Sequence, residues 1–369
     1  MSTSKAGTGP QPNLAQQVIR HIYKQIQDGT LKTGDKLPTN RELAKKLNVS
    51  ILTVQRSMKQ LEAQGTVTCH RRSGTFLENP DSITNPKIQS GLIGLFCPEV
   101  FSDFHTDMLI ELERGMMEQG KLLSINFTHS HPEREVVLLR SLARQRLEAL
   151  VYFTSPLVVS SETHSKTVSE WIQRYIEEGT FVLFADLCPP GFENRLISLD
   201  NQQAGKMLTE KLIKHGHRKI AFLGPTHLPS TSDRLAGYYS ALKKADLPVN
   251  DDWHLDVRLI ESADWQERTE ARIREMLVHH PDLTGFTVST QATAEIVSNV
   301  LNELPDRKFS TEESIASLFE TAAPPFEALA WIQVPGQKMG QKACKILLQD
   351  PAADYEPGHI KIKPIFWAD

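Results

Sequence analysis

Arginine and short hydroxyl side chains recur at close spacing near the amino end of the chain. Ser50 and Thr53 lie between Arg41 and Arg56, and residues 71–74 read Arg-Arg-Ser-Gly. A guanidinium group binds phosphate or guanine through paired N–H groups, and hydroxyl groups bond to phosphate oxygens. These residue types therefore indicate binding to nucleic acid, provided that the fold brings them to one surface.

Two helix caps predict the elements that carry these side chains. Thr39 stands three residues before Glu42, which is the spacing of a capping box, so a helix is expected to start at Asn40. Ser50 is a good cap for a second helix, and Gly65 stands where that helix is expected to end in a left-handed residue. The sequence therefore predicts two short helices joined by a tight turn.

A hairpin is expected after the second helix. Residues 66–70 alternate as a strand does, residues 71–74 form a basic turn, and residues 75–77 return. Residues 14–28 place apolar side chains at helical spacing and predict a further helix packed behind the other two. The whole is a winged helix-turn-helix, which places its second helix in the major groove of DNA.

Short motifs in this stretch recur in a known order and spacing: Gly34-Asp35-Lys36-Leu37-Pro38, Arg41-Glu42-Leu43-Ala44, Val49-Ser50, Thr53-Val54, Leu61, Gly65 and Gly74-Thr75-Phe76. They resemble the GntR-type operator-binding domain, over residues 14–78. With two departures taken into account, the resemblance implies a DNA-binding set of Arg41, Ser50, Ile51, Thr53, Gln55, Arg56, Arg71, Arg72, Ser73 and Gly74.

The two departures are Ile51 and Gln55, which stand where members of that family usually carry arginine. Arginine on guanine is the commonest specific base contact, whereas isoleucine suits a thymine methyl group and glutamine an adenine edge. We therefore expect this protein to read an operator different from the usual one of the family.

The charge of the chain is unevenly distributed. Residues 1–80 hold 12 Lys and Arg against 5 Asp and Glu, and the remaining residues hold 29 against 40, within a net charge of −4. A basic small domain on an acidic larger one suits local binding to phosphates. Residues 1–13 are polar and rich in Gly and Pro, which predicts a disordered leader and no signal peptide.

The four cysteines, Cys69, Cys97, Cys188 and Cys344, are scattered, so they predict buried free thiols and neither a disulfide framework nor a metal site. No apolar run approaches the length of a membrane span. We expect a soluble, cytoplasmic protein that contacts no membrane.

Residues 79–90 contain two Asn-Pro steps and few apolar side chains, which predicts a linker. Beyond it, short apolar strands alternate with amphipathic helices, which predicts a doubly wound α/β fold in two lobes with mainly parallel sheets. Strands are expected at 92–96, 122–125, 149–153, 181–185, 219–223, 255–260, 285–289 and 315–319. Helices are expected at about 104–119, 132–145, 165–178, 201–215, 232–244, 265–279 and 292–303.

Three segments of this second part carry a resemblance: Asp200-Asn201-x-x-Ala204-Gly205, then Gly216 to Gly224, then Ser232-x-Arg234-Leu235-x-Gly237-Tyr238. Together with Val334-Pro335 to Leu348 they resemble the LacI-type effector domain, which is related to periplasmic sugar-binding proteins. The resemblance implies an effector-binding and dimerisation domain over 91–369. Its first lobe is expected at about 91–215 and 330–350, and its second at about 218–329 and 355–369. A GntR-type head on such a domain is known from arabinose repressors.

The resemblance implies that Arg234 points into a cleft between the lobes and forks onto ligand hydroxyls or a carboxylate. Asp186 ends a strand where an acceptor is common, although a structural role is equally open. The other candidates follow strands or begin helices, and core packing is an alternative for each; the full set is Phe101, Asp103, Phe104, Ser155, Asp186, Arg234, Trp265, Gln291 and Glu320.

Thr290-Gln291 and Leu318-Phe319-Glu320 depart from the acidic pairs that LacI-type sugar binders usually carry, so a non-sugar ligand, or a domain that only dimerises, stays open. The chain lacks a phosphate-binding glycine loop, a nucleophile elbow and metal-ligand spacing, so we expect no enzyme, no cofactor and no metal. The prediction is a homodimeric transcription regulator, most simply a repressor, that binds an operator on double-stranded DNA under the control of a small, sugar-like effector.

Overall fold

The structure is a computed structural model that describes residues 14–70, 73–80, 90–98, 102–258, 264–304, 308–321, 324–348 and 358–368. Several expectations lie outside these residues: the leader, most of the linker, the candidate DNA contacts Arg71 and Arg72, and the candidate effector contact Phe101.

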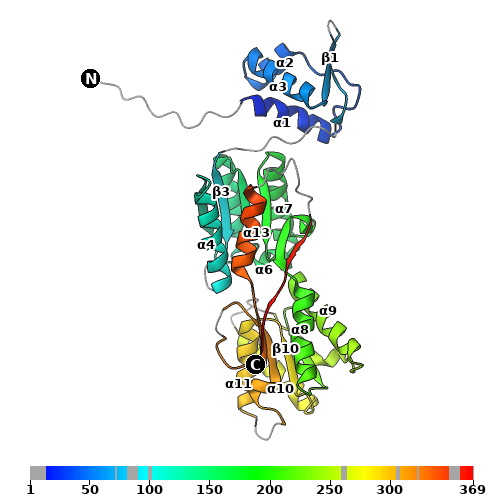
Figure 1. Ribbon diagram of the computed structural model, residues 1–369, viewed down its shortest axis with the longest axis vertical. Helices are drawn as coiled ribbons and strands as arrows, with labels where there is room; N and C mark the ends of the chain where they lie inside the picture. Colours follow the sequence, from blue (N-terminus) through cyan, green and yellow to red (C-terminus); the bar gives the residue numbers. More distant parts are fainter. Residues whose placement is uncertain are drawn as a thin grey trace, which may run out of the picture.

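The amino-terminal head folds as the helix caps predict. Its elements are α1 (Leu14–Gln27), α2 (Asn40–Leu47), α3 (Ile51–Ala63), β1 (Val67–His70) and β2 (Gly74–Leu77), drawn in blue in Figure 1. Apolar stripes on the three helices meet in one core, in which Val18, Ile22, Leu43, Val54 and Leu61 are completely buried. β1 and β2 pair as an antiparallel hairpin, so the winged helix-turn-helix is confirmed.

The first lobe is a parallel sheet in the order β13-β7-β6-β5-β3-β4. Figure 1 shows α13 lying along α4 beside this sheet. The cores on its two faces contain α4 and α13 on one side and α5 and α7 on the other. Its elements are β3 (Leu92–Cys97), α4 (Asp103–Met117), β4 (Leu122–Phe127), α5 (Pro132–Leu142), β5 (Ala149–Tyr152), α6 (Pro156–Ser160), α7 (Glu162–Glu177), β6 (Phe181–Ala185), β7 (Leu196–Leu199), α13 (Gly336–Leu348) and β13 (Ile360–Ile362).

The second lobe repeats the plan in the order β14-β12-β11-β10-β8-β9, with β14 antiparallel and the other strands parallel. Strands buried on both faces are nearly continuous apolar runs, which is why the sequence pattern identifies them. The elements are α8 (Asn201–Lys214), β8 (Ile220–Gly224), α9 (Pro229–Lys244), β9 (His254–Asp256), α10 (Trp265–His279), β10 (Gly285–Val288), α11 (Gln291–Asn302), α12 (Thr311–Ser314), β11 (Ile315–Phe319), β12 (Ala330–Gln333) and β14 (Ile365–Ala368).

The chain passes between the lobes three times: from β7 to α8, from β12 to α13, and from β13 to β14. Two of these crossovers touch, because the Asp200 N–H donates to the Ile362 carbonyl at 2.8 Å. Each lobe is therefore assembled from segments that are distant in sequence, and the two lobes are joined by adjacent connections.

The lobe boundaries expected from the sequence are wrong at three segments. α8 belongs to the second lobe, where it packs against α9 and the sheet and where Thr209 bonds to Thr287 of β10. β12 also lies in the second sheet, and β13 lies in the first. Periodicity reports whether a segment is a helix or a strand, whereas its lobe is decided by contacts with other segments, and for β13 the partner strand β7 is far away in the sequence.

Two smaller expectations also differ from the structure. The strand expected at 255–260 is confined to His254–Asp256 among the described residues, and just beyond it the Val257 N–H still donates to the Gly224 carbonyl of β8 at 3.0 Å. Cys69 is exposed on β1, whereas Cys97, Cys188 and Cys344 are buried free thiols as expected. The difference follows from the wing, whose two strands bury only one face.

Candidate functional site

The start of α3 is fixed by its cap. The Ser50 hydroxyl oxygen accepts a hydrogen bond from the Thr53 N–H at 3.1 Å and lies 2.8 Å from the Thr53 hydroxyl. α2 begins with the complete capping box between Thr39 and Glu42, and it ends at Asn48 in the left-handed region. The short turn between Asn48 and Ser50 therefore holds the two helices at a fixed angle.

The outer face of α3 presents the expected reading side chains. Ile51 is 45% exposed, and Gln55 and Arg56 are exposed beside it, while Val54 and Met58 face the core. Arg41 is exposed on α2. An exposed isoleucine at the first position of a helix does nothing for the core, which agrees with contact to a partner surface.

The wing is tied to α3 and ends in a tight turn. The Cys69 N–H donates to the Glu62 carboxylate at 3.3 Å, which joins β1 to the recognition helix. Gly74 has a φ of +115°, which L side chains rarely adopt, whereas the atom nearest to an added Cβ belongs to the flexible Lys36 side chain and can move away. The backbone conformation therefore requires a glycine here, and Ser73 beside it is exposed at the tip.

In the second domain, the strand order of each sheet defines where a ligand is expected. The order reverses between β3 and β5 in the first lobe and between β8 and β10 in the second. Ligands of open α/β sheets bind outside the carboxyl ends of the strands at such switch points. The segments that follow these four strands therefore form the candidate effector site.

Arg234 lies in this region and is the most constrained of the candidates. It is 7% exposed; its Nε donates to the Asn201 side-chain oxygen at 2.8 Å, and Nη1 donates to the Ser289 carbonyl at 2.5 Å and hydroxyl at 3.1 Å. Within the described residues, its other terminal nitrogen, Nη2, has no protein acceptor. The guanidinium is thus held rigidly with one group left to bind a ligand.

Charges from both lobes surround Arg234. Burial lowers the pKa of Arg234, and the carboxylates of Asp186 and Glu320 oppose that shift. Burial is the main cause that raises the pKa of Asp186; the carboxylate of Glu320 adds to this rise, and the guanidinium of Arg234 opposes it. Asp186 belongs to the first lobe, at the end of β6, while Glu320 follows β11 of the second. The sequence-predicted Asp186, Arg234 and Glu320 therefore come together across the lobes.

An aromatic cluster borders these charges on the side of the first lobe. The ring of Phe104 lies 4.8 Å from that of His105 and 5.9 Å from that of Phe153, and His105 lies 5.4 Å from Phe153. The Phe104 N–H donates to the Glu320 carbonyl at 3.1 Å, which is a direct contact between the lobes. Burial lowers the pKa of His105, and Asp186 opposes this.

Two glycines set the position of Arg234. A Cβ on Gly205 of α8 would lie 2.0 Å from the Arg234 carbonyl oxygen, and one on Gly237 of α9 would lie 2.1 Å from the Gln202 carbonyl oxygen. The two helices therefore touch through their backbones. This close contact brings the start of α9 to Asn201 and gives a structural reason for the glycines of the LacI-like segments.

The remaining candidates have other surroundings. Ser155 is completely buried, and its hydroxyl oxygen caps α6 by accepting from the Leu157 N–H. Trp265 is half-buried against the core of the second lobe, and Asp103 is exposed in the first turn of α4. The Gln291 side-chain oxygen accepts from the Thr321 hydroxyl at 3.4 Å. Ser155 therefore has a helix-capping role and Trp265 a packing role, whereas Gln291 lies near the switch point.

Sequence reasoning missed four residues that complete the site: His105, Phe153, Asn201 and Ser289. Asn201 is part of the Asp-Asn motif, and Ser289 stands at the end of an expected strand. Membership in the motif and the place at the strand end are the sequence signals that could have identified these two residues. Asn201 and Ser289 hold Arg234 through hydrogen bonds that span 33 and 55 residues along the chain, and His105 and Phe153 are brought together by ring contacts. Local pattern carries no information on such pairs.

No cluster of three or more metal-binding side chains occurs among the described residues. A search of the same residues for a helix long and apolar enough to cross a membrane also finds none.

Comparison with known proteins agrees with this geometry. Residues 90–367 match the family "Periplasmic binding proteins and sugar binding domain of LacI family", and residues 14–77 match "Bacterial regulatory proteins, gntR family". Because the first match covers most of the chain, the protein belongs to the LacI-type effector-domain family, and its head is a GntR-type winged helix. It is a transcription regulator of this two-part class.

Similar proteins include the arabinose metabolism transcriptional repressor of Geobacillus stearothermophilus, 24% identical over 346 residues that cover 90% of both chains. GalR of Escherichia coli is 25% identical over 276 residues, covering 72% of this chain and 75% of GalR. Among solved structures, a complex of the regulator CelR with cellobiose has a TM-score of 0.59 at 17% identity and covers 90% of this chain and 99% of that one. At that identity the likeness shows the fold alone.

Proposed function

We propose that the protein is a homodimeric repressor whose affinity for its operator is controlled by a small polyhydroxyl effector bound between the two lobes. The observation that carries the proposal is Arg234, buried and held by Asn201 and Ser289 at the switch point, with carboxylates from both lobes beside it. Carboxylates and a rigid guanidinium are acceptors and donors for hydroxyl groups. The arabinose metabolism repressor named above supports the same class of ligand.

The effector is expected to act by closing the lobes. Phe104 and Glu320 already join them by one hydrogen bond, and the three crossovers are the connections on which one lobe can move relative to the other. A ligand that binds the closed form better shifts the population towards it. The heads would then lose their alignment on the operator, and ligand affinity would fall reciprocally on DNA by about 5- to 150-fold.

The dimer is expected to form through the first lobe. Several apolar side chains there are exposed on α4 and on the edge strand β4, a set we call the apolar edge: Ile110 at 56%, Met117 at 63%, Leu122 at 72%, Ile125 at 39% and Phe127 at 39%. Exposed apolar side chains along an unpaired sheet edge favour association. A two-fold dimer also suits an operator of two half-sites in the cytoplasm.

A thermal-shift screen of the full chain with pentoses, hexoses, uronic acids and nucleosides tests the effector site. A ligand at 100 times its dissociation constant stabilises by about 2.7 kcal/mol. We expect a shift with one of these classes, and we expect Arg234→Ala to abolish it.

Because Arg234→Ala leaves Asn201 and Ser289 without their partner, a second variant is needed. Glu320→Ala removes an exposed side chain and is expected to weaken the shift without unfolding the protein. Glu312→Ala is the matched control, because Glu312 is also exposed but lies in α12, at the amino-terminal end of β11 and away from the site. A shift that survives both changes at the site would exclude the interlobe assignment, and the absence of any shift would favour a domain that only dimerises.

A further inference from the structure

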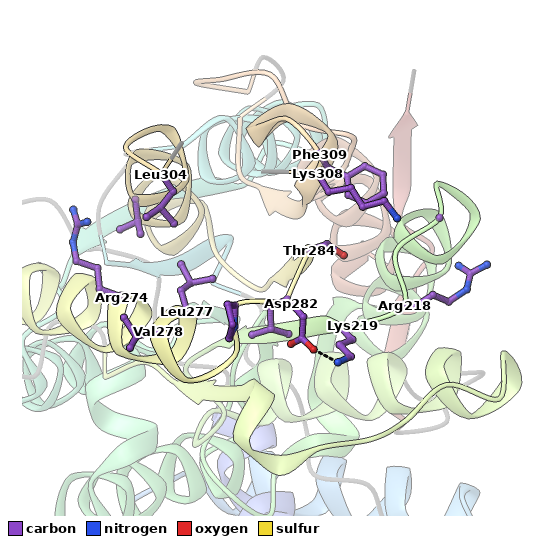
Figure 2. Close-up of a pocket in the computed structure, with 14 residues that line it drawn as sticks. Arg218, Lys219, Arg274, Leu277, Val278, Asp282, Thr284, Leu304, Lys308 and Phe309 are labelled. Carbon is purple, nitrogen blue, oxygen red and sulfur yellow. Dashed lines mark hydrogen bonds and ion pairs between the residues drawn. The ribbon is translucent and has the colours of Figure 1, made fainter. Parts of the chain in front are cut away.

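The second lobe carries a separate pocket at the opposite end of its sheet from Arg234. Its volume is about 850 Å³, within the range of small-molecule sites. Figure 2 shows it between the carboxyl ends of α10 and α11 and the segments that lead into β8 and β10. Strands run from this edge to the switch point, so the pocket and the candidate effector site are at least a strand length apart, on the order of 15 Å.

The pocket has an apolar floor and an apolar mouth. Leu283 and Val300 are buried in its floor, whereas Val278 is 76% exposed and Leu304 is 37% exposed at its mouth. An aliphatic side chain exposed on the last turn of a helix gains nothing from folding. A bound apolar body that covers Val278 and Leu304 removes that surface from water.

Cationic side chains lie around the mouth, and their partners differ. Lys219 is paired with Asp282, and Arg274 is paired with Glu270 and Glu303. By contrast, within the described residues Lys308 contacts only the face of the Phe309 ring, 5.1 Å away, and Arg218 donates only to backbone carbonyls.

The two cations without a carboxylate lie on the same side of the pocket. In the view of Figure 2, Lys308 and Arg218 lie to the right, with the Arg218 guanidinium turned away from the pocket, and Val278, Leu277 and Leu304 lie to the left. The carbonyl ends of α10 and α11 lie on the apolar side and disfavour an anion there. An anionic group is therefore best placed beside Lys308, with the apolar body over Val278.

We propose that this pocket is a second small-molecule site, which takes an amphipathic carboxylate: an apolar or aromatic body carrying one acid group. The site is independent of the interlobe effector. Lys308 meets the carboxylate, Phe309 packs against the body, and Val278 and Leu304 cover it.

Isothermal titration calorimetry of the full chain with two matched probes tests the proposal. Indole-3-acetate and tryptamine share an indole body but carry opposite charges. We expect indole-3-acetate to bind with a submillimolar dissociation constant and tryptamine at least tenfold more weakly. Val278→Asp and Lys308→Glu are each expected to weaken indole-3-acetate tenfold or more. Both side chains are exposed, so the fold is expected to survive.

Controls separate this site from other surfaces. Val249→Asp changes a valine that is 52% exposed elsewhere in the lobe, and Lys166→Glu changes an exposed lysine on α7; neither is expected to alter binding. Glu320→Ala is likewise expected to leave it unchanged. No binding of indole-3-acetate at millimolar concentration overturns the proposal, as does binding that Glu320→Ala removes and Val278→Asp does not. Equal binding of tryptamine overturns the assignment of charge.

Discussion

The carboxyl group of Glu135 is completely buried in the first lobe, where it accepts hydrogen bonds from the Tyr152 hydroxyl and, at 3.3 Å, from the Ser155 N–H. Burial raises its pKa from the ordinary 4.5 to about 7, although both hydrogen bonds oppose the shift. In the unfolded chain the group ionises near 4.5, while the folded protein holds the proton until pH 7. Between these values a rising pH therefore destabilises the fold.

Glu135→Gln removes this pH dependence. An amide, like the protonated acid, offers an oxygen that can accept from the Ser155 N–H and a hydrogen that can be donated to the Tyr152 hydroxyl oxygen, and it does not ionise. A pKa raised from 4.5 to about 7 corresponds to about 3 kcal/mol over the whole interval. Denaturant unfolding at pH 5.5 to 8 is expected to show the free energy of unfolding falling by about 2 kcal/mol in the unmodified protein relative to Glu135→Gln. Parallel pH profiles for the two proteins would refute the buried ionisation.

The base preference at single operator positions is also expected to depend on single residues. Gln55 is exposed on α3, where relatives of the GntR type usually carry arginine. If glutamine reads adenine, Gln55→Ala weakens the selected operator by about 1–3 kcal/mol, and Gln55→Arg changes the preferred base at that position to guanine. Selected-site binding measures both. Gln60→Ala, exposed further along the same helix, is the control, and an unchanged base preference in Gln55→Arg would speak against base contact.

At the scale of elements, the contact between α8 and α9 is the one that most strictly requires glycine, because the two backbones touch. Gly205→Ala places a methyl group against the Arg234 backbone, so the helices must separate. We expect a loss of about 1–3 kcal/mol of stability, together with loss of the effector-dependent thermal shift, because Arg234 moves from Asn201 and Ser289. Gly191→Ala is the control, since nothing lies within 4 Å of its added Cβ, although its φ of +92° adds local strain. Equal effects of the two changes would argue against helix contact as the cause.

The sequence identifies elements better than it identifies their partners. The head was predictable almost to the residue because caps such as Thr39 and Ser50 act within three positions. β7 was missed because a four-residue strand after a loop, with Ser198 among its apolar residues, carries little periodicity. β13 was placed in the wrong lobe because its partner lies more than 150 residues away. Arg234 came from a motif, whereas Ser289, which holds it, could be found only in three dimensions.

At the scale of the whole molecule, the apolar edge is expected to hold two copies together. Met117→Lys and Leu122→Lys each place a charge in that surface, so sedimentation is expected to show a shift from dimer to monomer. Operator affinity falls with it, because one head reaches only one half-site. Val249→Lys, an exposed valine of the second lobe, is the control. Dimers that persist in both variants would place the interface elsewhere.

The three crossovers impose an order on how the protein matures as it is synthesised. The head is one uninterrupted stretch of local contacts, whereas each sheet of the sensor waits for its last strand, β13 for one and β14 for the other. A chain emerging from the ribosome therefore completes its DNA reader long before either half of its metabolite sensor. Under the proposed dimerisation through the sensor, an unfinished chain presents a single reader, which reaches only one half-site of the operator.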